Sequence, residues 1–143
     1  MHFSVMDIPA FILLIILTIT DMKTRTIWKP AAIAGMIVGL LIRILLPTYP
    51  LLDGIGGILG GGLLLLVSWL SKEAIGRGDC YILCAIGAFY GFAGMTELFF
   101  IALLLASCWA VYLLVCKKAN RKTSFPFIPF LFLGWTLTRF FSV

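Results

Sequence analysis

Two aspartates stand at the ends of apolar segments that are far apart in the sequence. Asp21 follows the first apolar run, and Asp79 closes the stretch Gly76-Arg77-Gly78-Asp79 directly before another one. An ionisable group at the edge of an apolar helix costs free energy unless it faces a bundle interior or a wet cavity. Because the chain has only six acidic residues, two of them in equivalent positions are candidates for a shared site.

Such a pair would have a defined chemistry. Two carboxylates within a few ångströms of each other cannot both ionise easily, so the pair holds one shared proton. The ionised member can take a proton from water while the neutral member polarises an amide carbonyl, and the roles reverse at breakdown. If Asp21 and Asp79 converge, they predict an aspartic-type hydrolase that needs neither a metal nor a serine.

The rest of the chain predicts the elements that would position the pair. Of its 143 residues, 62% are hydrophobic and 12% charged, which is far outside soluble usage. Backbone amides cannot stay unpaired in lipid, and the apolar runs lack period-2 alternation, so we expect an all-α polytopic bundle of six transmembrane helices in one domain, residues 1–143. The six expected spans are Phe3–Thr20, Pro30–Leu46, Leu51–Leu70, Asp79–Phe92, Thr96–Cys116 and Phe125–Phe141.

The basic residues predict the orientation of these spans. Nine of them fall in the first, third and fifth loops, whereas Arg43 and Arg139 lie toward the opposite side. Positively charged loops stay in the cytoplasm, so both termini are expected outside. The same asymmetry explains the net charge of +5 without a nucleic-acid partner, and the cluster at residues 117–122 would favour anionic lipid headgroups. No basic residue precedes the first span, which is therefore not expected to be a cleaved signal peptide.

The other acids have plainer explanations. Asp7, followed by Pro9, is interpreted as a helix cap. Asp53 and Glu97 fall on the external side, and Glu73 lies in a basic loop. This leaves one pair of acids at a common depth, the cytoplasmic boundary.

Other polar and small residues give weaker signals. Cys80 and Cys84 lie one helical turn apart, but a zinc site needs four ligands and His2 lies across the membrane, so no metal is expected. The glycine-rich run at residues 54–62 lacks the residues of a phosphate-binding loop, and its Gly-x3-Gly spacings predict close helix packing. The glycines beside Asp79 allow positive φ and the close approach of another backbone. Tryptophans such as Trp69 and Trp135 are expected to anchor the chain in lipid.

Two stretches carry a resemblance to a known family. They are TDMKTRTIW at residues 20–28 and GRGDCYILCAIGAFYG at residues 76–91, which resemble the signature regions of the type IV prepilin peptidases and preflagellin peptidases. The matching residues are Asp21, Lys23, Arg25, Ile27, Gly76, Gly78, Asp79, Gly87 and Gly91. The segment at residues 125–130 also resembles the final Pro-Phe-x-Pro segment of the family; it is either a plain helix start or a part of the chain near the active site.

The resemblance implies a membrane-embedded aspartic endopeptidase in the cytoplasmic membrane of a prokaryote, with its active site facing the cytoplasm. It would remove the short basic leader from prepilin-like or preflagellin-like precursors, with Asp21 and Asp79 as catalytic residues. Support is expected from the motif residues Gly76, Gly78, Lys23 and Arg25. The implied partners are prepilin-like substrates and the lipid bilayer, no cofactor is implied, and the oligomeric state is left open.

The chain departs from the family pattern in its first loop. The family commonly has Pro-Asn after the isoleucine of the first motif, where this chain has Trp28-Lys29. Larger members carry a cytosolic insert with cysteine pairs and also N-methylate the new terminus. Because the first loop here is short, methylation is not expected.

Three alternative classes of protein compete with the peptidase. A small proton-coupled transporter could use paired acids as a proton relay, but inverted repeats and an acid near mid-membrane would then be expected. A non-enzymatic subunit of a pilus secretion machine would not need Asp21 and Asp79 together. Intramembrane proteases of the presenilin type share Gly-x-Gly-Asp, but the first motif and the chain length fit them less well.

Overall fold

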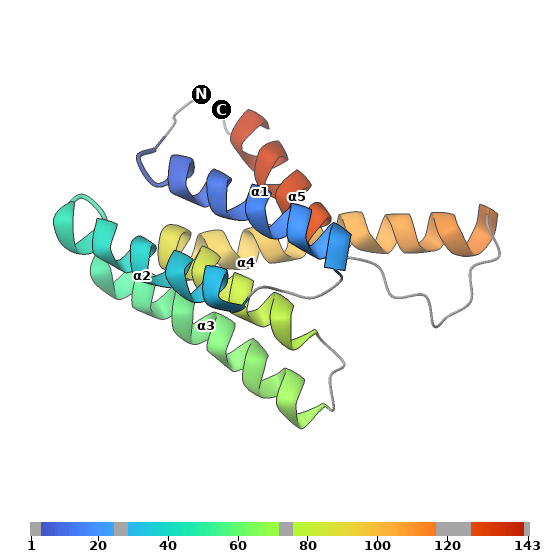
Figure 1. Cartoon of the computed structure of the whole chain (residues 1–143), viewed down its shortest axis with the longest axis horizontal. Coiled ribbons are helices and arrows are strands. Elements are labelled where there is room, and N and C mark those ends of the chain that lie inside the picture. The colour runs from blue at the N-terminus through green and yellow to red at the C-terminus, as the bar shows by residue number, and fades with distance from the viewer. Residues whose placement is uncertain (1–3, 25–28, 72–75, 117–126, 142–143) are drawn as a thin grey trace.

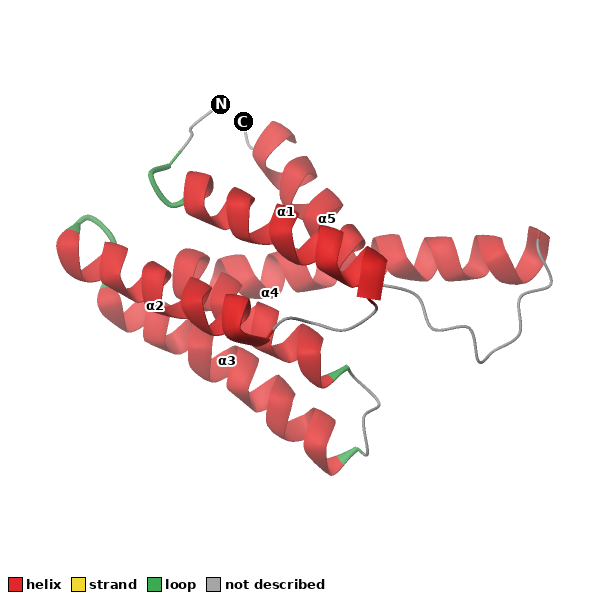
Figure 2. Ribbon diagram, viewed as in Figure 1, coloured by secondary structure: helices red, strands yellow, loops and turns green. Residues whose placement is uncertain are grey.

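The computed structural model of the chain describes residues 4–24, 29–71, 76–116 and 127–141. Within these ranges the chain forms helices and no strand, as Figures 1 and 2 show, so the all-α prediction is confirmed. The helices are α1 (Asp7–Thr24), α2 (Lys29–Leu45), α3 (Leu51–Leu70), α4 (Arg77–Cys116) and α5 (Ile128–Phe141). By length and composition, α3 and α4 are long and apolar enough to cross a membrane.

The helix bounds differ from the expected spans mainly at the ends. The bounds of α3 are those predicted, and α2 is shifted by one residue. Helix α1 continues to Thr24, so Asp21 lies in its last turn instead of following it. Helix α5 begins at Ile128, and the first two residues of the predicted sixth span lie outside the described residues.

Helix α4 contains the largest difference from the predicted spans. It is broken at Gly91, whose φ of 75° and ψ of −174° are not helical. Glycine adopts this conformation without the steric penalty of a Cβ atom. The break divides α4 into arm 77–90 and arm 92–116, so the two predicted segments exist, but the connection expected at residues 93–95 is helical. The chain therefore turns at one residue.

Arg43 of α2 stabilises this break. A break in a helix leaves the last carbonyl groups of the first arm without intrahelical donors. The guanidinium of Arg43, 4% exposed, donates from Nε to the Ala88 carbonyl at 2.8 Å and from a terminal nitrogen to the Phe89 carbonyl at 3.0 Å. The same group lies 3.6 Å from the Asp53 carboxylate. The charge that the sequence placed at the outer end of the second span is thus a buried structural group.

A second buried polar network joins α1, α4 and α5 at the same end of the bundle. Asp7 is fully buried; one of its oxygens accepts a hydrogen bond from Tyr90 Oη at 2.8 Å and lies 3.1 Å from Arg139 Nε. The Ser4 amide donates to the other oxygen at 2.7 Å, and Ser4 Oγ accepts from the Met6 amide at 3.3 Å. Ser4 and Asp7 therefore fix the turn that leads into α1, and the interpretation of Asp7 as a helix cap was incomplete because its carboxylate also bonds Tyr90 and Arg139.

Trp135 belongs to this network as well. It is 3% exposed, and its indole N–H donates to Tyr90 Oη at 2.8 Å. The expectation that it anchors the chain in lipid was wrong, because an indole beside a buried acceptor gains more from that hydrogen bond than from the interface. Trp69, by contrast, is 68% exposed.

Close packing between α3 and arm 77–90 holds the centre of the bundle. The backbones of Gly57 and Gly87 lie so close that a Cβ atom at either position would overlap the other glycine, and a Cβ atom at Gly61 would lie 2.7 Å from Cys84. The prediction of tight packing from the Gly-x3-Gly spacings is confirmed. This crossing fixes the arm that carries Asp79.

Candidate active site

Asp21 lies on the buried face of α1. Ala10, Leu14 and Leu17 are buried, and they recur at the spacing of one helical face. Asp21 continues this stripe by one turn and is 6% exposed. The carboxylate is therefore directed inward by the same periodicity that buries the apolar residues before it.

The first turn of α5 faces Asp21. The Phe127 carbonyl accepts hydrogen bonds from the amides of Phe130 at 3.0 Å and Leu131 at 3.2 Å, so Ile128 is the first residue of the helix. Its N–H has no acceptor within the helix and lies close enough to Asp21 to act on its carboxylate. Figure 1 shows the end of α1 beside the start of α5. The Pro-Phe-x-Pro-like segment thus contributes a backbone amide to the site.

Asp79 approaches from the first turn of arm 77–90. The Cys80 amide donates to the Gly76 carbonyl at 3.3 Å, so Gly76 caps the arm. The half-buried Asp79 side chain folds back over this glycine, and a Cβ atom at position 76 would lie 2.8 Å from Asp79 Oδ2. Gly76 is needed for the space it leaves, since among the described glycines Gly91 is the one with positive φ.

The structure brings the two aspartates together. The carboxylates lie close enough for the charge of Asp21 to act on Asp79. Among the described residues, Asp21 Oδ2 is buried without a hydrogen-bond partner, which is costly for a charged oxygen. The two charges therefore act on each other, and the buried Oδ2 of Asp21 has no hydrogen-bond partner within the described part of the chain.

Two of the other predicted site residues lie in the same helix turns as the paired acids. Gly78 lies half-buried in the first turn of arm 77–90, and Lys23 is exposed in the last turn of α1. Arg25 lies outside the described residues. Sequence reasoning missed Lys29, whose Nζ lies 5.9 Å from the centre of the Tyr81 ring and brings the start of α2 to the same end as the pair. Within the described residues no three His, Cys, Asp or Glu side chains form a group that could hold a metal ion.

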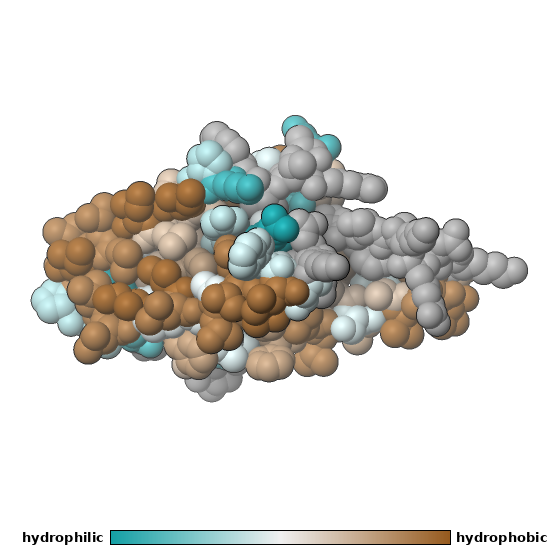
Figure 3. All heavy atoms as spheres, turned by 90° about the horizontal axis from the view of Figure 1, so that it is seen from below, coloured by the Kyte–Doolittle hydropathy of each residue, from teal (hydrophilic) through white to brown (hydrophobic). Residues whose placement is uncertain are grey.

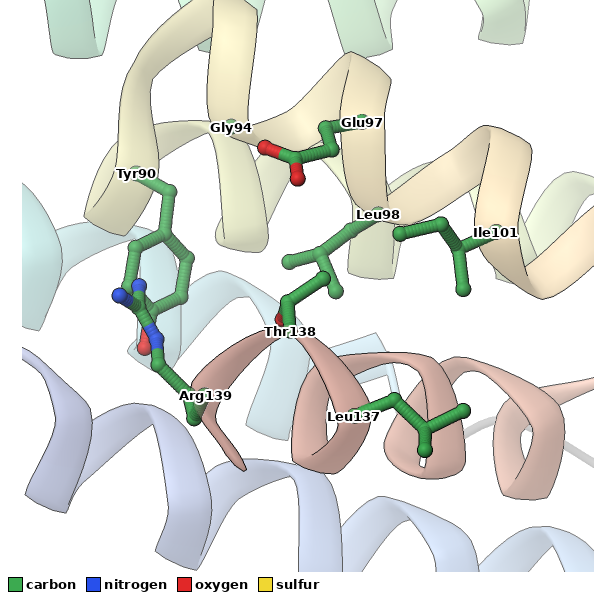
Figure 4. Close-up of a pocket in the computed structure, with 8 residues that line it drawn as sticks. All are labelled: Tyr90, Gly94, Glu97, Leu98, Ile101, Leu137, Thr138 and Arg139. Atoms are coloured by element: carbon green, nitrogen blue, oxygen red, sulfur yellow. The ribbon is translucent and has the colours of Figure 1, made fainter. Parts of the chain in front are cut away.

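A well-formed pocket lies at the other end of α5. It has a volume of about 440 Å³ and lies between arm 92–116 and the last turns of α5. Figure 4 shows Glu97 and Arg139 among its lining residues, with Arg139 stacked on Tyr90. Its lining residue Arg139 pairs with Asp7 at the start of α1, whereas Asp21 lies in the last turn of that helix. The length of α1 therefore separates the pocket from Asp21. Its lining residues include one acid, Glu97, and hold no pair comparable to Asp21 and Asp79.

The comparisons with known proteins agree with the motifs. Residues 8–111 match the model of the type IV leader peptidase family, a range that contains both aspartates. A prepilin leader peptidase/N-methyltransferase of Xanthomonas campestris pv. campestris is 32% identical over 107 residues, which cover 71% of this chain and 37% of that protein. One of Pseudomonas putida is 29% identical over 129 residues, covering 85% and 45%, and one of Aeromonas salmonicida is 26% identical over 129 residues, covering 85% and 44%.

The chain spans less than half the length of these relatives. No solved structure matches it. The family match covers well over half of the chain and includes both signature regions around the paired carboxylates. The chain therefore belongs to the type IV leader peptidase family.

Proposed function

We propose that this chain is a membrane-embedded aspartic endopeptidase that removes the short basic leader from prepilin-like precursors. The observation that carries the proposal is the electrostatic interaction between Asp21 and Asp79, which come from separate helices. Isolated buried acids have structural explanations, but two acids whose charges act on each other are suited to sharing a proton. Support also comes from the family match and from the names of the relatives.

The proposed reaction uses one ionised and one neutral carboxyl group. The ionised group takes a proton from water, whose oxygen attacks the carbonyl carbon of the scissile peptide bond, while the neutral group gives its proton to the carbonyl oxygen. In the second step the carboxyl group that took the proton from water gives it to the leaving nitrogen and the C–N bond breaks. The other carboxylate takes back the proton of one hydroxyl group of the tetrahedral intermediate as the carbonyl re-forms. Each turnover returns the pair to its starting state of one proton.

The proposed setting is the cytoplasmic membrane, with six transmembrane segments in one domain and both termini outside. The break at Gly91 divides the five helices of the described residues into six segments. The ion pair between Asp7 and Arg139 holds the start of α1 and the end of α5 at one end. The face in Figure 3 is apolar over most of its described surface, which suits contact with lipid. Asp21 and Asp79 would then lie toward the cytoplasm, because the nine basic residues of the first, third and fifth loops favour the cytoplasmic side.

The proposed substrate follows from this placement. A prepilin-like precursor joins a positively charged leader to an apolar helix, so its scissile bond would arrive at the cytoplasmic boundary beside the paired acids. Lys23 and Arg25 would set the topology, because a cationic leader is repelled by them. Methylation of the new terminus is not proposed for this chain. A proton-coupled transporter has less support, since both acids lie in terminal turns of their helices.

The test is to coexpress a tagged prepilin-like precursor with the wild type, Asp21→Asn or Asp79→Asn and to follow leader removal on a gel. Asparagine keeps the shape of the side chain but cannot exchange the proton, so both variants should leave the precursor uncut. Glu97→Gln is the matched control, because Glu97 is exposed and lines the distant pocket. Cleavage that survives either aspartate change, in a protein inserted normally in the membrane, refutes the proposal.

A further inference from the structure

The pocket between arm 92–116 and the last turns of α5 carries opposite charges on facing walls. Glu97 comes from the arm and Arg139 from α5, around a volume of about 440 Å³, and Figure 4 shows both side chains toward one end of it. The other end is apolar and is lined by Leu98, Ile101 and Leu137. We infer that the pocket binds a phospholipid with a primary amine in its headgroup, phosphatidylethanolamine. Its ammonium group would contact Glu97, its phosphate Arg139, and its chains the apolar end.

The packing of α5 against arm 92–116 shapes the pocket. A Cβ atom at Gly134 would lie 3.2 Å from Cγ2 of Ile101, so the two helices touch there. One turn further along α5 they leave space between them, which the pocket occupies. Leu98 is buried and forms its floor, whereas Glu97 and Leu137 are exposed. The pocket therefore opens outward from the bundle, and a lipid can reach it from the side.

The guanidinium of Arg139 is held in a fixed position at the edge of the pocket. Within the described part of the chain it forms its ion pair with Asp7, through Nε at 3.1 Å, and not with Glu97. It also stacks on the Tyr90 ring, 4.5 Å from the ring centre, a favourable contact for a cation. Asp7 faces one of the five N–H donors of the group, and the other four lie on its terminal nitrogens. Such a fork of donors matches the oxygens of a phosphate.

A zwitterion fits this arrangement better than other lipid headgroups do. An acid and a base that face one pocket without pairing complement a ligand that carries both charges. A purely anionic headgroup is repelled by Glu97, and Asp7 already offsets much of the charge of Arg139. A choline headgroup has no N–H to donate to Glu97. The pocket lies at the end of the bundle where α1 starts and α5 ends, which is the outer boundary in the proposed membrane setting. The inference rests on that setting and not on the peptidase reaction.

The experiment measures lipid binding to the full-length protein in detergent by native mass spectrometry. Phosphatidylethanolamine, phosphatidylcholine and phosphatidylglycerol with identical oleoyl chains are compared. We expect the wild type to bind phosphatidylethanolamine about five- to tenfold more tightly than the other two, because one charge-assisted hydrogen bond has about that effect on affinity. In Glu97→Gln this preference should disappear. Equal binding of the three lipids by the wild type, a preference for either of the other two, or an unchanged preference in Glu97→Gln would overturn the inference.

Two further measurements test whether the lipid occupies this pocket. Leu137→Trp places a larger side chain in the pocket and should weaken phosphatidylethanolamine binding about tenfold. Leu133→Trp is the matched control and should bind as the wild type does, because Leu133 is exposed one turn earlier on α5 and does not line the pocket. Soluble O-phosphoethanolamine lacks the chains and should not displace the lipid. Equal binding by the two tryptophan variants, or full displacement by the soluble headgroup, would overturn the assignment. No precursor is present in these measurements, so their failure is distinguishable from a failure of leader removal.

Discussion

Gly76→Ala tests whether the space beside Asp79 matters for catalysis. The Asp79 carboxylate folds over the Cα atom of Gly76, and a Cβ atom there would lie 2.8 Å from Oδ2. Ordinary van der Waals contact begins at 3.4 Å, so the oxygen must move by about 0.6 Å. The atom that gives way is the end of a flexible side chain, and the fold should tolerate the change. The displaced atom is a reacting group of the proposed mechanism.

The expected effect on the rate follows from that displacement. Misplacing a catalytic group by 1 Å can cost about a hundredfold, so 0.6 Å predicts a loss of roughly tenfold in leader removal. Gly76 also caps arm 77–90, and alanine is a poor cap, so stability should fall by roughly 1 kcal/mol. Gly76→Ala therefore changes both the helix cap and the position of the Asp79 carboxylate, and a second variant is needed to distinguish the two effects.

Gly76→Ser separates the two effects. Serine is a good cap but carries the same Cβ atom, so this variant should recover stability and stay roughly tenfold slow. Gly62→Ala is the control for adding a methyl group elsewhere, because no atom lies within 4 Å of the Cβ that it would introduce. The assay is initial-rate cleavage of a tagged prepilin-like precursor by purified variants, with thermal unfolding measured in the same detergent. Wild-type rates in both Gly76 variants would refute the reasoning.

Two further predictions concern the opposite end of the bundle. Arg43→Ala leaves two buried carbonyl groups and Asp53 without their donor. The free energy of unfolding should therefore fall by about 3 kcal/mol. An unchanged melting temperature in detergent would contradict the role of Arg43 at the break. Tyr90→Phe removes the hydroxyl between Asp7 and Trp135. The free energy of unfolding should fall by about 1–3 kcal/mol, while leader removal stays near the wild-type rate. A loss of cleavage in a stably folded variant would show that this network belongs to the active site.

Local sequence signals predicted much of the helical framework. The apolar run of α3 is bounded by Pro50 and by polar residues, so its ends were found correctly. The two arms of α4 were also expected, but the position of the break was not. It depends on Gly91 adopting φ of 75°, and nothing in the sequence distinguishes this glycine from Gly94 three residues later.

The sequence predicted the two acids of the candidate site but not the groups that surround them. Asp21 continues a buried stripe at helical spacing, which is a local pattern, and Asp79 follows a recognisable glycine motif. The amide of Ile128 could not be found in this way, because a backbone donor has no side-chain signature. Its contact with Asp21 arises only when α5 packs against α1. The pairing of Asp7 with Arg139 likewise joins opposite ends of the sequence.

A double-mutant cycle on Asp21 and Asp79 tests the central claim most directly. Rates of leader removal would be measured for the wild type, Asp21→Asn, Asp79→Asn and the double variant, all purified in the same detergent. If the two carboxylates share one proton and act as a unit, each single change should reduce the rate as much as both together. Effects that multiply in the double variant, or a single variant that still cleaves, would contradict the account.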